Sequence, residues 1–205
     1  MKSSSTTKVS ITKAQFEKVR KTVLPELKKG LPVHLTYHNY QHVINVITAT
    51  DYLLQKESVP EEDRWMILTA ALLHDSGFLQ TYQNHEEVSC DFARDILPGF
   101  DYGEECIEEI CRMIMATKIP QTPQDRYGEI ICDADLFYLG TDDFVPVANN
   151  LFIELKSIGA VKTEKEWDEK QLSFLHQHQY FTKTAVTELA PKKAANVKDL
   201  EEKWK

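Results

Sequence analysis

The stretch Ile67-Leu68-Thr69-Ala70-Ala71-Leu72-Leu73-His74-Asp75-Ser76-Gly77 decides how the rest of the chain is interpreted. Its first part is apolar except for Thr69, which predicts a helix that is buried over most of its surface. An imidazole and a carboxylate follow directly, and Gly77 predicts the end of the helix. Because a buried, ionised aspartate is costly unless it is paired or bound to a metal, the stretch predicts a functional polar group at the end of a core helix.

Outward from this stretch, apolar residues recur mostly at intervals of three and four from Ile11 onward, and no sustained alternation of the strand type occurs. This periodicity predicts an all-α protein. Ser58 and Glu61, on either side of Pro60, are expected to form a capping box at the start of the helix that leads to His74. The expected helices cover about 16–30, 39–54, 60–75, 83–97, 104–117, 127–139, 142–158 and 164–189.

The length of 205 residues is sufficient for one domain with a substantial core. We expect a disordered N-terminus over residues 1–10, one compact multi-helix domain over 11–190, and a charged tail over 191–205. The tail is compatible with a short helix or with a loosely docked terminus. The four cysteines form no CxxC pair, and we expect them to be reduced packing residues.

The net charge of −8, with no dense basic run, argues against duplex nucleic acid and anionic membranes as partners. No apolar run approaches roughly 18 residues, and the N-terminus lacks the apolar region of a signal peptide, so we expect a cytoplasmic protein. A polyanionic substrate would need a local source of positive charge, and a metal ion is the simplest one in an acidic protein.

Three separate segments place imidazole or carboxylate groups beside apolar helices: His38 with His42, His74 with Asp75, and Asp133 with Asp135. His38 and His42 are four residues apart and can share a helix face. His74 and Asp75 diverge by about 100° on an ideal helix, so they can reach one site only near a helix end. Each segment alone also fits an ordinary exposed or capping position. Together they indicate a metal site, and mixed His/Asp ligation suits Mn, Mg, Fe, Ni or Zn.

The order of these residues resembles the H…HD…D ligand pattern of the HD-domain metal-dependent phosphohydrolases, over about residues 35–180. The resemblance implies a compact multi-helix HD-like bundle that binds one or two divalent metal ions. For the last aspartate of the pattern, Asp133 remains the alternative to Asp135 as metal ligand. A second ion would be held by a bridging Asp75 and waters, because Thr117-Lys118 stands where many-histidine members have a histidine. The implied metal ligands are His42, His74, Asp75 and Asp135.

Two further motifs resemble the cyclic-nucleotide phosphodiesterase branch of this superfamily. The segment 37–42, YHNYQH, resembles its YHNxxH signature and implies that His38 is the general acid, and the segment 132–136 resembles its ADL segment. Gln171 and Phe174 resemble its QxxF pair, which implies a purine clamp, although Phe174 fits the core stripe of its helix equally well. In contrast, Ser76-Gly77-Phe78 stands where that branch has His-Pro-Gly.

Other polar residues complete the expected site. We expect Asn39, His85, Glu86 and Asp133 around the ligands, with His85 or Glu86 orienting His38 or a metal-bound water. Lys118 either contacts a substrate phosphate or simply complements a helix dipole. His176 and His178 are two residues apart and cannot share a helix face, so we expect them at the surface or at the pocket rim.

These features predict a hydrolase that cleaves a small-molecule phosphoester with a metal-activated water. A nucleotide phosphodiester is the favoured substrate. A nucleotidase or phosphomonoesterase with the same metal centre is the alternative, and so is a non-catalytic nucleotide-binding sensor. The sequence leaves the oligomeric state open.

Overall fold

The computed structural model describes residues 10–204, and this part of the chain contains α-helices and 3-10 helices but no strand. The all-α prediction is confirmed. The α-helices are α1 (Lys13–Gly30), α2 (Tyr40–Lys56), α3 (Glu61–Leu73), α4 (His85–Ile96), α5 (Glu104–Ala116), α6 (Arg126–Asp135), α7 (Phe144–Ser157), α8 (Glu164–Gln177), α9 (Lys183–Glu188) and α10 (Ala190–Glu202). The 3-10 helices are η1 (Ser76–Leu79), η2 (Leu97–Phe100) and η3 (Phe137–Gly140).

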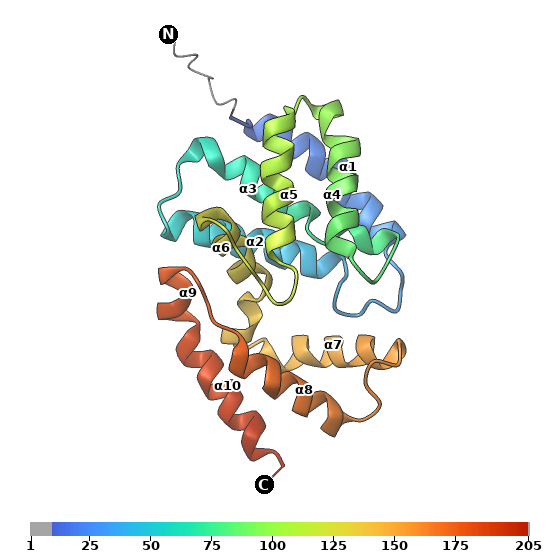
Figure 1. The fold of residues 1–205 in the computed structure, drawn as a ribbon, viewed down its shortest axis with the longest axis vertical. Helices are drawn as coiled ribbons and strands as arrows, with labels where there is room; N and C mark the ends of the chain where they lie inside the picture. Colours follow the sequence, from blue (N-terminus) through green and yellow to red (C-terminus); the bar gives the residue numbers. More distant parts are fainter. Residues whose placement is uncertain (1–9, 205) are drawn as a thin grey trace.

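The helices pack in two layers, each with its own apolar cluster. Helices α1 to α6 form a bundle, and α7, α8 and α10 lie together beyond α6, towards the C-terminus (Figure 1). Phe137 in η3 packs against both clusters. The fully buried side chains of the first layer include Leu27, Leu53, Leu72, Ile110 and Ile131. The second cluster includes Leu139, Phe144, Trp167, Leu175 and Ala185.

Different structures were expected for the two ends of the chain. The segment 1–10, expected to be disordered, lies outside the described residues except for Ser10. The charged tail forms most of α10, which packs against η3 and α8, so the helical alternative is the one observed. Trp204, just beyond α10, donates a hydrogen bond to the buried Asp168 carboxylate at 2.8 Å and fastens this end to α8.

Helix α3 is the buried helix that the sequence predicts, but its N-terminus differs from the expectation. Every residue from Met66 to Leu73 is buried. The expected capping box does not form, because Pro60 occupies the N-cap and makes no side-chain cap hydrogen bond. Ser58 instead turns the chain with φ at +51°. The acidic first turn, residues 61–63, complements the helix dipole in place of a cap.

Two helices end earlier than their apolar periodicity predicts. The helix expected over 127–139 stops at Asp135 and continues as η3, and the helix expected over 164–189 is interrupted after Gln177. The interruption has a clear cause. The buried Asp133 carboxylate accepts hydrogen bonds from the backbone N–H groups of Phe181 at 3.0 Å and Thr182 at 2.7 Å. This contact between distant segments cannot be inferred from local periodicity.

Gly77 permits the close approach of η1 to the start of α4. A Cβ atom at this position would lie 2.0 Å from the carbonyl oxygen of His85. We expect Gly77→Ala to lower the free energy of unfolding by about 3 kcal/mol, because the backbone of α4 has to move. Gly99→Ala is the control, since nothing lies within 4 Å of its Cβ position. Urea denaturation of both variants measures the difference, and equal stability would contradict this role of Gly77.

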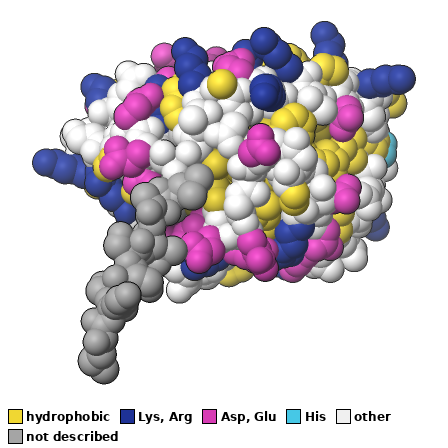
Figure 2. All heavy atoms as spheres, turned by 90° about the horizontal axis from the view of Figure 1, so that it is seen from above, with side chains coloured by type: hydrophobic (Ala, Val, Ile, Leu, Met, Phe, Trp, Pro, Cys, Tyr) yellow, Lys and Arg dark blue, Asp and Glu magenta, His cyan; other side chains and the backbone are white. Residues whose placement is uncertain are grey.

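The distribution of charged side chains on the surface is relevant to the expectation that nucleic acid and membranes are not partners. On the face seen along the longest axis, acidic and basic side chains both occur and no continuous basic surface forms (Figure 2). Within the described residues, no helix combines the length and the apolar character that crossing a membrane requires.

Candidate functional site

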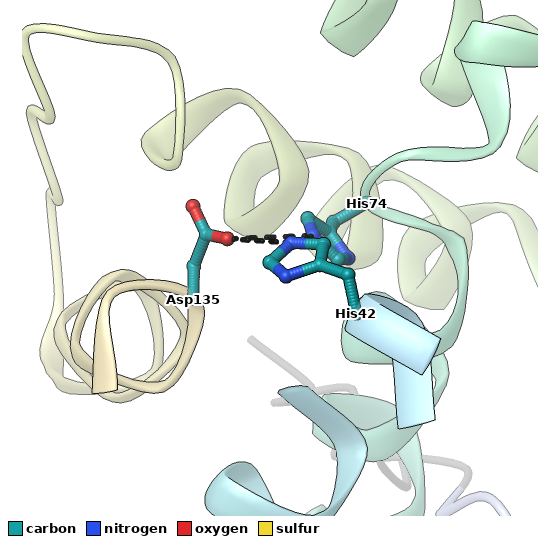
Figure 3. A group of neighbouring side chains, drawn as sticks. All are labelled: His42, His74 and Asp135. Atoms are coloured by element: carbon teal, nitrogen blue, oxygen red, sulfur yellow. Dashed lines mark hydrogen bonds and ion pairs between the residues drawn. The ribbon is translucent and has the colours of Figure 1, made fainter. Parts of the chain in front are cut away.

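Three helix ends converge at the candidate metal centre. Asn39 caps α2 by accepting hydrogen bonds from the N–H groups of Gln41 and His42, which places His42 in the first turn. His74 follows the last residue of α3, and Asp135 is the last residue of α6. Figure 3 shows the two imidazoles and the Asp135 carboxylate pointing toward one another. Asn39, expected near the ligands, therefore acts as the cap that positions one of them.

The ligand atoms of this cluster lie within a small volume. Potential ligand atoms of His42, His74 and Asp135 all lie within 4.8 Å of one another. The Nε2 atom of His42 is 3.1 Å from Oδ1 of Asp135 and 3.3 Å from Oδ2 of Asp75. The Nε2 atom of His74 is 3.2 Å from the same Asp75 oxygen. The structure thus brings together all four residues that the sequence resemblance implies as ligands.

The donor set fits a divalent metal ion. Asp75 Oδ2 is buried and has no hydrogen-bond partner in the described structure, although both imidazoles are near it. An unpartnered buried carboxylate oxygen is costly, and a cation would satisfy it. His74 Nδ1 contacts the carbonyl oxygen of Ala71 at 2.9 Å, which holds the proton on Nδ1 and leaves Nε2 available as a ligand.

Charge in this cluster is strongly coupled. Burial lowers the pKa of His74, but the nearby Asp75 and Asp135 carboxylates outweigh it, and the pKa lies well above the ordinary value. The pKa of His42 is raised for the same reasons. Burial raises the pKa of Asp75, yet the neighbouring imidazoles hold it well below its usual range. The carboxylates and imidazoles of this cluster thus favour each other's charged forms.

These shifts give the metal-free protein a characteristic pH dependence. The stabilisation from the raised imidazole pKa values is fully present below the ordinary value of 6.5 and is lost as the pH rises through the raised values. We therefore expect the Tm of chelator-treated protein to fall as the pH rises above 6.5. Divalent metal should reverse the trend, because ligand imidazoles must be neutral. Thermal unfolding over this pH range, with and without Mn²⁺, tests both statements, and a metal-independent profile would contradict them.

His38, the expected general acid, is held by a carboxylate that the sequence reasoning missed. Its Nδ1 lies 2.5 Å from Oε1 of Glu154 on α7, and its backbone N–H donates to Oε2 of the same residue at 3.0 Å. Glu154 is fully buried and also accepts hydrogen bonds from Tyr37 N–H and the Tyr82 hydroxyl. In the described structure His38 Nε2 has no hydrogen bond. Glu154 thus fixes the imidazole and leaves Nε2 available.

The environment keeps Glu154 ionised. Burial raises its pKa, but the hydrogen bonds and the charge of His38 outweigh burial, so the pKa lies below the ordinary value. The only sequence signal for this residue is its spacing. Glu154 lies between Leu151 and Leu155, which both line the pocket, so a carboxylate interrupts an inward-facing stripe of α7.

His85 and Glu86 lie on the other side of Asp75, as expected for residues around the ligands. His85 Nε2 is 3.5 Å from Oδ1 of Asp75 and 3.4 Å from Oε1 of Glu86. Phe78, which the sequence reasoning did not single out as a site residue, stacks between His38 and His85, with ring centroids 4.3 and 3.9 Å away. The site therefore has an aromatic wall between the candidate acid and the second histidine.

A cavity of about 580 Å³ joins these groups to the expected substrate contacts. Gln171 and Phe174 on α8 line it together with His38 and the candidate ligands Asp75 and Asp135. Most of its wall is contributed by apolar and aromatic side chains of both layers. Gln171 is buried, and within the described residues its amide makes no hydrogen bond. A buried amide without a protein partner is suited to bind a ligand.

Lys118 also lines the cavity, but it is not a free cation. Its Nζ lies 2.5 Å from Oε1 of Glu87, and the ion pair raises the pKa of Lys118. Lys170, which the sequence reasoning missed, lines the cavity from α8 and donates to the carbonyl oxygen of Ala160 at 2.8 Å. Both lysines lie at positions where they can contribute positive charge near the cavity.

Three residues considered from the sequence, Asp133, His176 and His178, lie outside the metal cluster. Asp133 points to the chain segment after α8, where it binds the N–H groups of residues 181 and 182. Burial raises its pKa to about 6. His176 is exposed, whereas His178 is half-buried and lines a smaller neighbouring cavity. The geometry thus favours Asp135 over Asp133 as the candidate metal ligand from α6.

One protein family and solved structures of two proteins are similar to this chain. Residues 39–138 match the model of the HD domain family. The fold is similar to Bacillus subtilis YpgQ in complex with ADP, with a TM-score of 0.62 and 21% identity over 92% of this chain and 94% of that one. It is also similar to a protein described as a predicted HD superfamily hydrolase from an uncultured Thermotogales bacterium, with a TM-score of 0.61 and 19% identity over 91% and 89% of the two chains. No curated protein sequence matches. About half of the chain, residues 39–138, therefore resembles the HD domain family, and the all-helical fold is similar to that of these two proteins.

Proposed function

We propose that this protein is a metal-dependent phosphodiesterase that hydrolyses a nucleotide diester. The HD domain supports the coarser statement, a metal-dependent phosphohydrolase. One observation carries the finer statement. A single cavity is lined by two candidate metal ligands, Asp75 and Asp135, by the His38 imidazole that Glu154 holds, and by the Gln171 amide beside the Phe174 ring. ADP bound to the structural neighbour YpgQ is consistent with a nucleotide-like ligand.

In the proposed reaction, a metal ion and side chains of the protein have separate roles. His42, His74, Asp75 and Asp135 would hold the ion, which supplies a nucleophilic water of lowered pKa and positive charge for the phosphate oxygens. His38 gives a proton from Nε2 to the leaving oxygen, since Glu154 holds Nδ1 and fixes the orientation of the ring. The predominantly apolar wall excludes water and contacts the nucleoside.

Substrate panels test this proposal. In buffer with Mn²⁺ or Mg²⁺, we expect turnover of cyclic AMP and of bis(4-nitrophenyl) phosphate. Release of inorganic phosphate from mononucleotides without diester cleavage would favour the phosphomonoesterase. Tight nucleotide binding without turnover of any ester would favour a sensor. Either result would overturn the proposal.

The base contact has its own expected result. Gln171→Ala should raise KM for a purine diester about tenfold, the effect of losing about 1.4 kcal/mol of binding, because the amide no longer reaches the base. It should leave the kinetics with bis(4-nitrophenyl) phosphate unchanged. Gln124→Ala, at an exposed position outside this cavity, is the matched control. Unchanged purine-diester kinetics in Gln171→Ala would show that the amide does not contact the base.

A further inference from the structure

A second, smaller cavity adjoins the substrate cavity across Phe174. Phe174 and Ile119 line both cavities, whose volumes are about 270 and 580 Å³. Gln121 and the segment 177–181 provide most of the remaining wall of the smaller one. Ligand pockets usually measure about 300–1,000 Å³. The smaller cavity is therefore suited to one part of a molecule whose other part occupies the larger cavity.

Two buried polar atoms of the lining residues lack partners. Gln121 Oε1 and His178 Nε2 are buried and have no hydrogen-bond partner in the described structure. Buried polar atoms in folded proteins are nearly always hydrogen-bonded, and an unpartnered one requires an explanation. Gln121 and His178 both line this cavity, Gln121 from the loop after α5 and His178 from the segment after α8. A bound group that satisfies both would explain them.

The remaining contacts of these side chains settle which atom donates. Gln121 Nε2 donates to the carbonyl oxygen of Cys132 at 3.1 Å, so Oε1 is a free acceptor. His178 Nδ1 lies 3.0 Å from Nζ of Lys193, and because an ammonium only donates, Nδ1 accepts and Nε2 carries the proton. Burial lowers the pKa of His178 to about 4, so the ring is neutral at pH 7. The cavity thus offers one donor and one acceptor without charge from either.

A nucleobase matches this set of groups, because it carries both hydrogen-bond donors and acceptors around a flat apolar ring. Phe174, Ile119 and Phe181 supply apolar walls for such a ring. Resting on the proposed phosphodiesterase function, we infer that the smaller cavity is a second base-binding subsite and that the preferred substrate is a linear dinucleotide. One base lies on the Gln171 side of Phe174, and the other lies between Gln121 and His178.

Steady-state kinetics of the metal-loaded full chain test the subsite. The probes are adenylyl-(3′,5′)-adenosine and the methyl ester of adenosine monophosphate, which lacks the second nucleoside. His178→Asn keeps an acceptor for Lys193 but removes the Nε2 donor, and it should lower kcat/KM for the dinucleotide about tenfold, equivalent to about 1.4 kcal/mol. The methyl ester should be unaffected, which also shows that the variant is folded. His178→Gln, with an amide nitrogen near the Nε2 position, should retain most of the activity.

The controls separate the possible failures. His176→Asn, at an exposed position paired with Glu201, should leave both substrates unchanged. Equal losses for both esters in His178→Asn, or no loss for either, would overturn the subsite. An abasic dinucleotide analogue should behave like the methyl ester, and full activity with it would show that the cavity contacts a sugar instead. If neither ester is cleaved, the phosphodiesterase function is wrong. Equal dinucleotide affinity of wild type and His178→Asn would then overturn the subsite separately.

Discussion

Asp135→Asn is expected to lower kcat for a phosphodiester by at least about a thousandfold while the protein remains folded. The substitution removes one negative charge from a buried cluster in which Oδ1 lies 3.1 Å from His42 Nε2. An amide is a poor ligand for a divalent ion at such a site. Loss of metal charge stabilisation of about 4 kcal/mol corresponds to this factor. Turnover and the metal content of the purified variant, measured together, test the expectation.

Asp133→Asn is the matched control, since it changes another buried aspartate of the same helix. Asp133 binds the backbone of Phe181 and Thr182. We expect this variant to lose about 1–3 kcal/mol of unfolding free energy, because the amide cannot accept both contacts equally well, and to retain its metal. If instead Asp133→Asn loses the metal and Asp135→Asn keeps it, the proposed ligand set is wrong.

Glu154→Gln is expected to lower kcat about a hundredfold with little change in KM. General acid catalysis contributes about 10²–10⁴ in rate, and the imidazole of His38 depends on Glu154 for its orientation. The amide nitrogen of glutamine is itself a donor, and it would face N–H and O–H donors that now bind the carboxylate. This mismatch should destabilise the fold by about 2 kcal/mol. Kinetics at a temperature where the variant is fully folded separate the two effects.

The leaving group distinguishes an effect on proton donation from a general disturbance. A 4-nitrophenyl ester needs no proton to leave, so Glu154→Gln and His38→Asn should affect its cleavage far less than that of a ribose ester. Tyr82→Phe removes one hydrogen bond to Glu154 at 3.1 Å and retains the contact with His38. Tyr82→Phe should therefore lower kcat less than tenfold. Equal losses for both esters would contradict proton donation by His38.

The sequence was sufficient to predict the class of fold and to select the four candidate ligands. The fold class and the buried helix before His74 follow from local apolar composition. The four ligands are what the resemblance to the HD-domain ligand pattern implies. Helix limits were less accessible, because the break after Gln177 depends on a hydrogen bond from Thr182 to the distant Asp133. Apolar spacing on one helix contains no record of that contact.

Glu154 shows why part of the site was missed. It lies 116 residues from His38 along the chain, on a helix of the other layer, and only the packing of the two layers brings them together. A single glutamate in an amphipathic helix has no motif of its own. Phe78 was likewise visible only as an apolar residue after Gly77. Its position between two imidazoles is a property of tertiary structure.

The two-layer arrangement places the four candidate ligands apart from the proposed base contacts, while Glu154, which holds His38, lies in the second layer. The four candidate ligands belong to the first layer, whereas Gln171 and Phe174 belong to a helix of the second, which has its own apolar cluster. Substitutions on α8 can therefore change which molecule is accepted without disturbing the groups that cleave it. An ancestral protein with this architecture could acquire new substrates through changes confined to α8, and directed evolution of specificity should begin on that helix.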